Sequence, residues 1–264
     1  MQKKYRLKFH KYHGAGNDFI MVNGLTSNCQ LTIAQITFLC NRHLGIGADG
    51  LIIIEKSKNA DFKMIYFNAD GLEGSMCGNG GRSAVSFALR EGIVSETSVF
   101  EAFDGIHKAI VTENDKAKFQ VILTMKNIDT YDFDNKRLIV NTGSPHYVTL
   151  TDNLTSIDIY KEGQKIRYDP LFSPHGINVN FMQMIGNDIH LRTYERGVEN
   201  ETLSCGTGVT AAAIAAQLWF GISQPAIYTK GGTLKVKLKK EGNRFVDIFL
   251  EGPVQCVFSG EIDI

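Results

Sequence analysis

Two cysteines of this chain occur in the same local sequence. Cys77 is followed by Gly-Asn-Gly and Cys205 by Gly-Thr-Gly, and an apolar, alanine-containing segment comes next in both places. A cysteine at the start of a helix lies beside unpaired backbone N–H groups and the positive end of the helix dipole, which favour the thiolate over the thiol. Because neither core packing nor helix capping requires a repeated Cys-Gly-X-Gly, we predict that both thiols are reactive.

Two such thiols indicate one kind of chemistry. If they approach one carbon atom of a ligand from opposite sides, a thiolate can remove a proton from one face while the partner thiol returns a proton to the other. A carboxylate held by both helix N-termini would gain enolate-like charge, which the preorganised N–H groups stabilise. Glycines beside the cysteines let the backbone come close to such a ligand. The pattern therefore favours stereochemical inversion by two bases.

The remaining cysteines and most histidines favour structural roles. Cys29, Cys40 and Cys256 lie in apolar patterns, which is typical of small buried side chains. Five cysteines without a Cys-X-X-Cys pair argue against a disulfide framework and against a zinc site. The histidines do not have the spacing of metal ligands, so we expect no metal. Only His146, in a Gly-Ser-Pro-His turn, is placed like a site residue.

The composition limits the class of partner. The 264-residue chain carries 28 basic and 28 acidic residues, and its sequence pI is near 7.0. This balance gives no electrostatic footprint for nucleic acid or an anionic membrane, so a small polar or zwitterionic ligand fits better. The basic first dozen residues lead into no apolar signal region, and no apolar run reaches the length of a membrane span. We therefore expect a cytoplasmic protein that binds neither nucleic acid nor membranes.

Two buried helices are needed to position the cysteines. The segment 84–89, after Cys77, is apolar on nearly every side, which is typical of a buried helix. The segment 209–220, after Cys205, is also apolar, and Gly221 is its predicted C-cap. Alanines recur at the same distances after both cysteines. This correspondence indicates an internal repeat about half the chain long.

Other elements follow from periodicity and turn residues. The sequence predicts a short helix over 32–40 with Thr32 as its N-cap, and a buried strand over 51–54. Alternating segments between 94 and 124 predict antiparallel strands. Two prolines and a glycine in 169–176 predict a loop without regular structure.

We infer an α+β fold with two pseudo-symmetric halves. Each half would wrap antiparallel strands around one buried central helix, and the active site would lie in the cleft between the halves. The N-terminal half would comprise residues 1–125, joined by the last strand at about 254–264. The C-terminal half would comprise residues 126–253. Each half would carry one of the two repeated cysteines.

At these positions the sequence strongly resembles the diaminopimelate epimerases, over essentially the whole chain. The motifs that carry the resemblance are Gly14-Ala-Gly-Asn-Asp-Phe19, Asn68-Ala-Asp-Gly71, Met76-Cys-Gly-Asn-Gly80 with Arg82, Pro145-His146, Glu195-Arg-Gly197, Glu201-Thr202 and Cys205-Gly-Thr-Gly208. The resemblance implies an isomerase of lysine and peptidoglycan precursor biosynthesis that interconverts LL- and meso-diaminopimelate without a cofactor. We also expect a homodimer.

The same resemblance implies roles for individual residues. Cys77 and Cys205 would be the base and the acid, exchanging roles with the direction of the reaction. His146 and Glu195 would tune the pKa values of the two thiols. The residues whose backbone would hold the carboxylate of the reacting centre are Gly78, Asn79, Gly206 and Thr207. The residues that would bind the ammonium and carboxylate groups of the substrate are Asn17, Asn68, Asn178, Glu195 and Arg196.

Two departures and two alternatives accompany this hypothesis. Gly50 stands where many family members have glutamine, and Ser144 where many have asparagine, so both bear on the distal substrate contacts. A proline or hydroxyproline racemase of the same fold is the nearest alternative, but a ligand with one carboxylate would not need Arg196. The other alternative is a non-catalytic amino-acid-binding protein in which Cys77 and Cys205 form a switchable disulfide.

Overall fold

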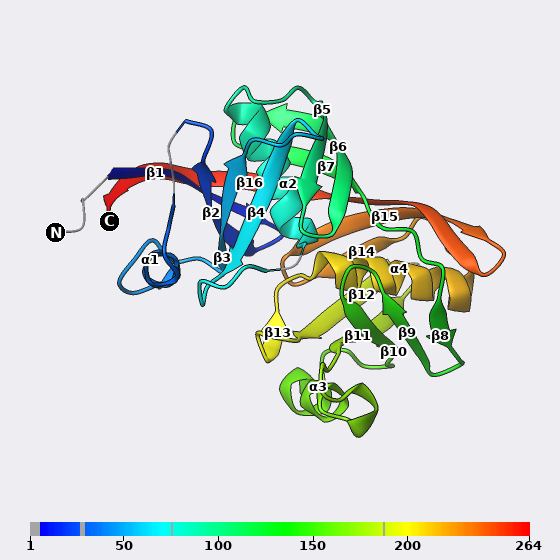
Figure 1. Ribbon diagram of the computed structural model, residues 1–264. Coiled ribbons are helices and arrows are strands. Elements are labelled where there is room, and N and C mark those ends of the chain that lie inside the picture. The colour runs from blue at the N-terminus through cyan, green and yellow to red at the C-terminus, as the bar shows by residue number, and fades with distance from the viewer. Residues whose placement is uncertain (1–5, 27–29, 75, 187) are drawn as a thin grey trace. The chain divides into compact units, whose positions relative to one another are not determined.

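The computed structural model describes residues 6–26, 30–74, 76–186 and 188–264, and it contains two compact units (Figure 1). Unit 1 comprises Met1–Leu123 and Pro253–Ile264, and unit 2 comprises Thr124–Gly252. The fold is sheet-rich and barrel-like, with four α-helices among the described residues. Strand β16 (Arg244–Asp263) contributes residues to both units.

The strands of unit 1 form a closed series. Their order is β1-β2-β3-β4-β5-β6-β7-β16, and the end of β16 pairs antiparallel with β1. Pairing the last strand with the first leaves no open sheet edge, which would otherwise invite strand addition. The bounds are β1 Arg6–Gly14, β2 Asn17–Asn23, β3 Gly50–Glu55, β4 Phe62–Asn68, β5 Thr97–Ala102, β6 Gly105–Asp115 and β7 Lys118–Thr124.

Unit 2 has a similar series, in the order β16-β15-β14-β12-β11-β10-β9-β8, with β13 paired to β12. An isolated bridge joins Ile128, just before β8, to Phe245 on β16. The bounds are β8 Tyr131–Phe133, β9 Arg137–Asn141, β10 Pro145–Leu150, β11 Asn178–Ile185, β12 Asp188–Glu195, β13 Asn200–Thr202, β14 Ala226–Thr229 and β15 Gly232–Glu241.

The sheets are mixed, which corrects the expectation of purely antiparallel strands. In unit 1, β2 pairs with β3 and β4 with β5 in parallel; in unit 2, β10 pairs with β11 and β12 with β14 in parallel. Parallel neighbours cannot be joined by a tight hairpin and need a crossover. The helices provide it, because α1, α2, α3 and α4 each lie in the chain between the strands of one parallel pair. The strands of 94–124, by contrast, are antiparallel as predicted.

Helices α2 (Gly78–Arg90) and α4 (Gly206–Phe220) begin directly after the two repeated cysteines. Residues 78–88 of α2 and 206–216 of α4 are buried, so the prediction of two buried helices is confirmed. Within unit 1, α2 packs on β1, β2, β3, β4 and β6. Within unit 2, α4 packs on β9, β10, β11, β12, β14 and β15. Gly221 ends α4 with a φ of 74°, as the C-cap prediction requires.

Three smaller elements show what the sequence patterns could and could not predict. Helix α1 (Ile33–Cys40) begins at Thr32 with a full capping box, as predicted. Helix α3 (Ile159–Arg167) was not predicted. The prediction that 169–176 has no regular structure is wrong in part, because Pro170–Phe172 forms a 3₁₀ turn. Proline at the first position of such a turn is favourable, since its missing N–H would have no partner there.

Among the described residues, no helix combines the length and the apolar character that a membrane span needs. The described His, Cys, Asp and Glu side chains also form no group of three or more that could hold a metal ion.

Candidate active site

Cys77 occupies the N-cap of α2, and its side chain takes part in the cap. The Gly80 N–H donates to Cys77 Sγ across 3.4 Å, and the Gly81 N–H donates to the Cys77 carbonyl oxygen across 2.7 Å. The thiol also contacts Asn17 Oδ1 at 3.5 Å. Backbone N–H groups at a helix N-terminus stabilise negative charge on sulfur. The prediction that Cys77 opens a buried helix is therefore confirmed, and its side chain is partly exposed.

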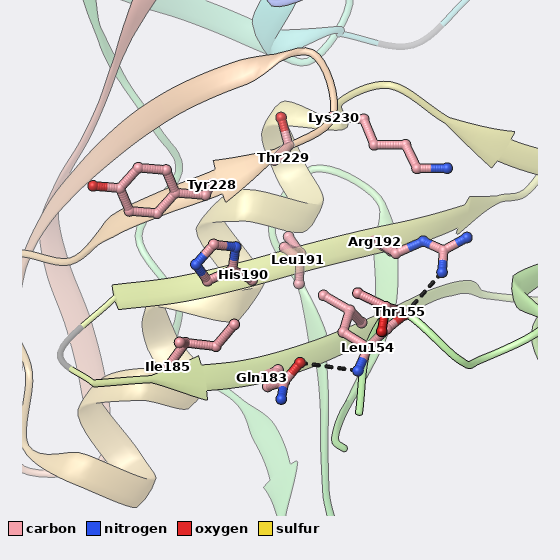
Figure 2. Close-up of a pocket in the computed structure, with 10 residues that line it drawn as sticks. All are labelled: Leu154, Thr155, Gln183, Ile185, His190, Leu191, Arg192, Tyr228, Thr229 and Lys230. Carbon is pink, nitrogen blue, oxygen red and sulfur yellow. Dashed lines mark hydrogen bonds between the residues drawn. The ribbon is translucent and has the colours of Figure 1, made fainter. Parts of the chain in front are cut away.

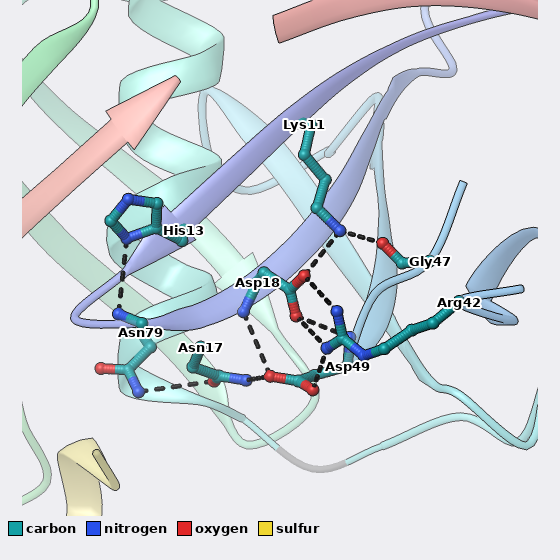
Figure 3. Close-up of polar contacts among 9 residues, drawn as sticks. Lys11, His13, Asn17, Asp18, Arg42, Gly47, Asp49 and Asn79 are labelled. Atoms are coloured by element: carbon teal, nitrogen blue, oxygen red, sulfur yellow. Dashed lines mark hydrogen bonds and ion pairs between the residues drawn. The ribbon is translucent and has the colours of Figure 1, made fainter. Parts of the chain in front are cut away.

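Asn17 and Asn79, two predicted substrate-binding residues, lie together beside this thiol. Asn79 Nδ2 donates to Asn17 Oδ1 across 3.4 Å, and Asn17 Nδ2 donates to Asp49 Oδ2 across 2.7 Å (Figure 3). Because Asp49 accepts from the amide nitrogen, the carbonyl oxygen of Asn17 must be the end that faces Cys77. The orientation of Asn17 is thus fixed by its neighbours.

A group of four charged side chains lies beside Asn17 (Figure 3). Arg42 forms two hydrogen bonds to Asp18, of 2.7 and 3.0 Å, and one of 2.8 Å to Asp49. Lys11 is 2.7 Å from Asp18 and donates to the carbonyl oxygen of Gly47. Burial opposes ionisation of Asp18, but the hydrogen bonds from Arg42 and Lys11 hold its pKa well below its usual value. These contacts keep the loop before β3 and the start of β2 in fixed positions.

Asn68 ends β4 directly opposite Gly50 of β3. Among the described residues its side chain makes no hydrogen bond, and its backbone holds the turn to Leu72. The departure at Gly50 has a steric explanation, because a Cβ there would lie 2.4 Å from the ring of Tyr66 and 2.5 Å from the carbonyl oxygen of Phe67. Tyr66 therefore occupies the space that a side chain at position 50 would need.

Cys205 occupies the N-cap of α4 and lies in a different environment. It is buried, with 8% of its surface exposed, and it makes no cap hydrogen bond through its side chain. Cys205 Sγ instead lies 3.4 Å from Thr207 Oγ1. The two helix starts are alike in backbone and differ in what touches the sulfur.

His146 reaches the second thiol through Thr207. His146 Nε2 lies 2.8 Å from Thr207 Oγ1, and its Nδ1 lies 3.0 Å from Asn180 Nδ2. Asn180 Nδ2 also donates to the Tyr147 carbonyl oxygen, so that nitrogen is the donor and His146 Nδ1 accepts. His146 therefore carries its proton on Nε2 and donates it to Thr207, which leaves the Thr207 hydroxyl proton to point at Cys205 Sγ.

Burial keeps His146 neutral. Its side chain is fully buried, and desolvation, together with the charge of Arg196, lowers the pKa of His146 to about 3. Gly208, the last glycine of the repeated motif, makes room for this arrangement. A Cβ at Gly208 would lie 2.5 Å from Asn180 Oδ1 and 3.3 Å from the His146 ring. The glycine thus serves protein packing as well as any ligand.

Asn178 joins the Arg196 turn to the strand of His146. Asn178 Oδ1 accepts from the Arg196 backbone N–H across 2.9 Å, and its Nδ2 donates to the Pro145 carbonyl oxygen across 2.9 Å. Arg196 Nη1 donates to the His175 carbonyl oxygen across 3.2 Å. Glu195 Oε2 accepts from the hydroxyl of Thr202 across 2.8 Å.

Within each unit, then, the structure groups the predicted residues differently. Unit 1 brings Asn17 and Asn79 to Cys77, and unit 2 brings His146 to Cys205 through Thr207. Asn178 and Arg196 form a separate hydrogen-bonded pair.

Two residues of these networks were not identified from the sequence as site residues with a role. Asn180 fixes the tautomer of His146, and its position two residues after Asn178, on the same face of β11, was the available signal. Arg82 was named only as part of a motif, although its side chain is fully buried. Of the cysteines assigned to the core, Cys40 and Cys256 are buried as predicted, and Cys29 lies outside the described residues. Burial raises the pKa of Cys40 to about 11, which suits an inert thiol.

A pocket on β11, β12 and β14 of unit 2 does not coincide with these residues (Figure 2). Its lining residues are Leu154, Thr155, Gln183, Ile185, His190, Leu191, Arg192, Tyr228, Thr229 and Lys230. Arg192 already donates to both carboxylate oxygens of Glu201 at 2.7 Å and to the Leu154 carbonyl oxygen at 2.8 Å. The Arg192 guanidinium in this pocket is therefore already hydrogen-bonded to groups of the protein.

Comparison with known proteins covers nearly the whole chain. A family model described as diaminopimelate epimerase matches residues 9–127 and 138–257. The diaminopimelate epimerase of Flavobacterium psychrophilum is 45% identical over 260 residues, which are 97% of this chain and 100% of the relative. The diaminopimelate epimerase of Chlorobaculum tepidum is 40% identical, over 95% of this chain and 99% of the relative.

Solved structures with little sequence identity share the fold. A phenazine biosynthesis protein of the PhzF family from Bacillus anthracis superposes with a TM-score of 0.75 at 14% identity, over 98% of this chain and 99% of that chain. A hydroxyproline epimerase from Agrobacterium vitis superposes with a TM-score of 0.72 at 14% identity, over 100% of this chain and 94% of that chain.

Proposed function

The chain belongs to the diaminopimelate epimerase family, and from that premise we propose that it interconverts LL- and meso-diaminopimelate by a cofactor-independent two-base reaction. The observation that carries the mechanism is the pair of cysteines, each at the N-cap of a buried helix in its own unit. The reaction is an isomerisation at one carbon atom, so the protein needs to remove a proton from one face of that carbon and add a proton to the opposite face. Two thiols suffice for this when one of them is ionised.

In the forward step we propose that the thiolate of one cysteine takes the α-proton and becomes a thiol. The C–H electron pair passes into the adjacent carboxylate, which becomes enolate-like. The thiol of the other cysteine then gives its proton to the opposite face of the same carbon atom and becomes the thiolate. The protein returns to its starting state when the two cysteines exchange this proton with water, and the reverse reaction uses them in the opposite roles.

The developing negative charge would be held by backbone N–H groups. We propose that those of Gly78 and Asn79 and those of Gly206 and Thr207 bind the carboxylate at the reacting centre, because the first N–H groups of a helix have no partner inside the helix. Donors aimed at developing charge lower the barrier more than donors aimed at the resting substrate.

This chemistry requires that the two cysteines face one ligand. We propose two pseudo-symmetric halves, residues 1–125 with the last strand and residues 126–253, each with a central helix and with the substrate in a cleft between them. The proposal is supported by the order of elements, because strand, strand, helix, strand, strand, helix recurs from β1 to α2 and, with the short β13 added, from β9 to α4.

The residues beside Cys205 can adjust the pKa of its thiol. We propose that His146 tunes Cys205 through Thr207, since the neutral imidazole donates to the Thr207 hydroxyl and thereby turns the hydroxyl proton toward sulfur. Glu195 would tune the thiols from the end of β12, where Thr202 donates to its carboxylate.

The remaining predicted residues would recognise the substrate's charged groups. We propose that Asn17, Asn68, Asn178 and Glu195 bind ammonium and carboxylate groups and that Arg196 anchors a carboxylate. The hydrogen bond from Arg196 N–H to Asn178 would keep this turn in place while the guanidinium binds. A homodimer and a cytoplasmic location complete the proposal, the latter because both thiols must stay reduced to act.

Incubation of the reduced protein with LL-diaminopimelate in deuterated water tests this function. We expect meso-diaminopimelate that carries deuterium at the inverted α-carbon. L-Proline and trans-4-hydroxy-L-proline serve as competing substrates, because a racemase of that type would invert them instead. Unchanged stereochemistry of diaminopimelate with a native circular dichroism spectrum would contradict the assignment, and ligand binding without exchange would favour the non-catalytic alternative.

A further inference from the structure

Arg82 is a fully buried cation in the second turn of α2. Its Nη1 donates to the Gly78 carbonyl oxygen across 3.2 Å, and its Nη2 donates to Asn79 Oδ1 across 2.7 Å. Its Nε has no hydrogen-bond partner among the described residues. Both acceptors are neutral, so the hydrogen bonds orient the guanidinium without balancing its charge.

No carboxylate among the described residues forms an ion pair with Arg82, although ion pairs involving other arginines are numerous. A buried charge without an opposite charge is strongly unfavourable, and a guanidinium cannot escape by losing its proton near neutral pH. Desolvation lowers the pKa of Arg82 to about 10, and Cys77 is the charged group that acts in the opposite direction. The side chain therefore stays a cation and requires an anion nearby.

The same position in the other half is neutral. Aligning Cys77 with Cys205 places Thr210 opposite Arg82, and the Thr210 hydroxyl donates to the Gly206 carbonyl oxygen across 3.0 Å. Cys205 Sγ lies beside Thr207 Oγ1, and His146, which contacts the same hydroxyl, is neutral. At this aligned position, the side chains of the two helices thus differ by one full positive charge.

We propose that Arg82 is a positioning residue that supplies the counter-charge of the Cys77 thiolate, so that Cys77 rather than Cys205 is ionised in the resting protein. The inference rests on the proposed function in taking Cys77 as one of the two bases. Beyond that function, the inference specifies that Cys77 is the base in the resting protein and that the Arg82 side chain determines this.

A hydrogen-bonded path connects the cation to the thiol. Arg82 Nη2 donates to Asn79 Oδ1, and Asn79 Nδ2 donates to Asn17 Oδ1. That oxygen lies 3.5 Å from Cys77 Sγ. An oxygen acceptor beside sulfur favours the protonated thiol, by less than about one pH unit for a neutral hydrogen bond. A nearby opposite charge lowers the pKa of a group by about one to three units. The cation and the Gly80 N–H therefore outweigh the carbonyl oxygen.

The other groups around α2 do not supply a competing charge. Titratable side chains on the elements packed against α2 or in the same core include His10, Tyr12, His13, Asp18, Tyr66, His107 and Cys256. Desolvation lowers the pKa of His10 and raises that of Tyr12, so both are neutral near pH 7. Asp18 belongs to the group of Lys11, Arg42 and Asp49, whose two positive and two negative charges cancel. His107 contacts Asp104 at 2.8 Å on β6, and Glu91 lies at the opposite end of α2.

Alkylation of the two thiols with iodoacetamide as a function of pH tests the proposal. Mass spectrometry of the two peptides gives a separate midpoint for each cysteine, and a midpoint does not depend on how exposed the thiol is. We expect the Cys77 midpoint to lie below that of Cys205 in the unaltered protein. In Arg82→Met it should rise by about one to three pH units while the Cys205 midpoint stays, and Arg82→Lys should restore most of the difference.

Ser86→Ala is the matched control, because it removes another buried hydrogen bond of α2, from Ser86 Oγ to the Arg82 carbonyl oxygen, without changing charge. It should leave both midpoints in place. An unchanged Cys77 midpoint in a folded Arg82→Met protein, or equal shifts of both cysteines, would overturn the proposal. If Arg82→Met does not fold, the unaltered protein decides, since a lower midpoint for Cys205 also overturns it. Alkylation needs no substrate, so failure to epimerise diaminopimelate would refute the proposed function without affecting this result.

Discussion

Replacing Thr207 by valine removes one oxygen atom from the path between His146 and Cys205. Valine has nearly the same shape as threonine, and the backbone N–H at position 207 is unchanged. Two groups lose a partner. The His146 Nε2–H loses its acceptor at 2.8 Å, and Cys205 Sγ loses the hydroxyl at 3.4 Å.

The size of both effects follows from burial. His146 is fully buried, so an unsatisfied N–H there should lower the free energy of unfolding by about 1–3 kcal/mol. The Cys205 thiolate loses one hydrogen bond of about 1 kcal/mol, which corresponds to a rise of about 0.7 units in its pKa. The two changes have different origins and can be measured separately.

Urea unfolding measures the first effect, and alkylation of Cys205 against pH in a Cys77→Ser background measures the second. Thr207→Ser is the matched control, because it keeps the hydroxyl and loses only a methyl group. We expect Thr207→Val to raise the alkylation midpoint of Cys205 and Thr207→Ser to leave it near that of the parent. Equal midpoints in the two variants, or a lower one in Thr207→Val, would refute the hydrogen-bond path.

Three further predictions concern other parts of the two units. Gly50→Ala should lower the free energy of unfolding by about 1–3 kcal/mol in urea, because its Cβ would lie 2.4 Å from the Tyr66 ring and 2.5 Å from a backbone oxygen; an unchanged midpoint would show that β3 yields easily. The pKa of His146 falls from 6.5 to about 3 on folding, so the unfolded chain binds more protons and stability should decline as pH drops from about 6.5 toward 3. In His146→Gln, the free energy of unfolding should fall less over this pH range, by up to roughly 4 kcal/mol. If the free energies of unfolding of the variant and the unaltered protein fall in parallel as the pH drops, this prediction is contradicted. Asn178→Leu should raise KM for diaminopimelate more than it lowers kcat, because the Arg196 backbone loses its 2.9 Å hydrogen bond; a pure loss of kcat would place Asn178 in the chemical step instead.

The elements that depend on local sequence could be predicted. The two cysteines at helix starts, the buried faces of α2 and α4, the Thr32 cap and the Gly221 cap all follow from patterns within one segment. Such features need no knowledge of what lies across the fold. This is why the candidate thiols could be named from the sequence.

Helix α3 was not predicted, and it has Gly163 in its middle, although glycine is among the poorest helix formers. The structure gives the glycine a packing role. A Cβ at Gly163 would lie 2.5 Å from Tyr194 Cβ on β12, so the helix can approach the sheet only without a side chain there. Contact with a strand far along the chain is invisible to a local pattern.

The parallel strand pairs and the hydrogen-bond paths were missed for the same reason. Whether β4 pairs with β5 in parallel depends on which strands become neighbours, and that is settled by tertiary packing. Asn180 and Arg82 are likewise ordinary polar residues in the sequence. Only the contacts to His146 and Asn79 distinguish them.

The central claim is that each cysteine handles the proton of one face. Single variants Cys77→Ser and Cys205→Ser, each incubated with LL- and with meso-diaminopimelate in deuterated water, test it most directly. The remaining cysteine can then remove a proton from one isomer and return deuterium to the same face, with no inversion. We predict that each variant exchanges the reacting α-proton of one isomer only, and that the two variants choose opposite isomers. Inversion by either variant, or exchange of both isomers by one of them, would contradict the two-base account.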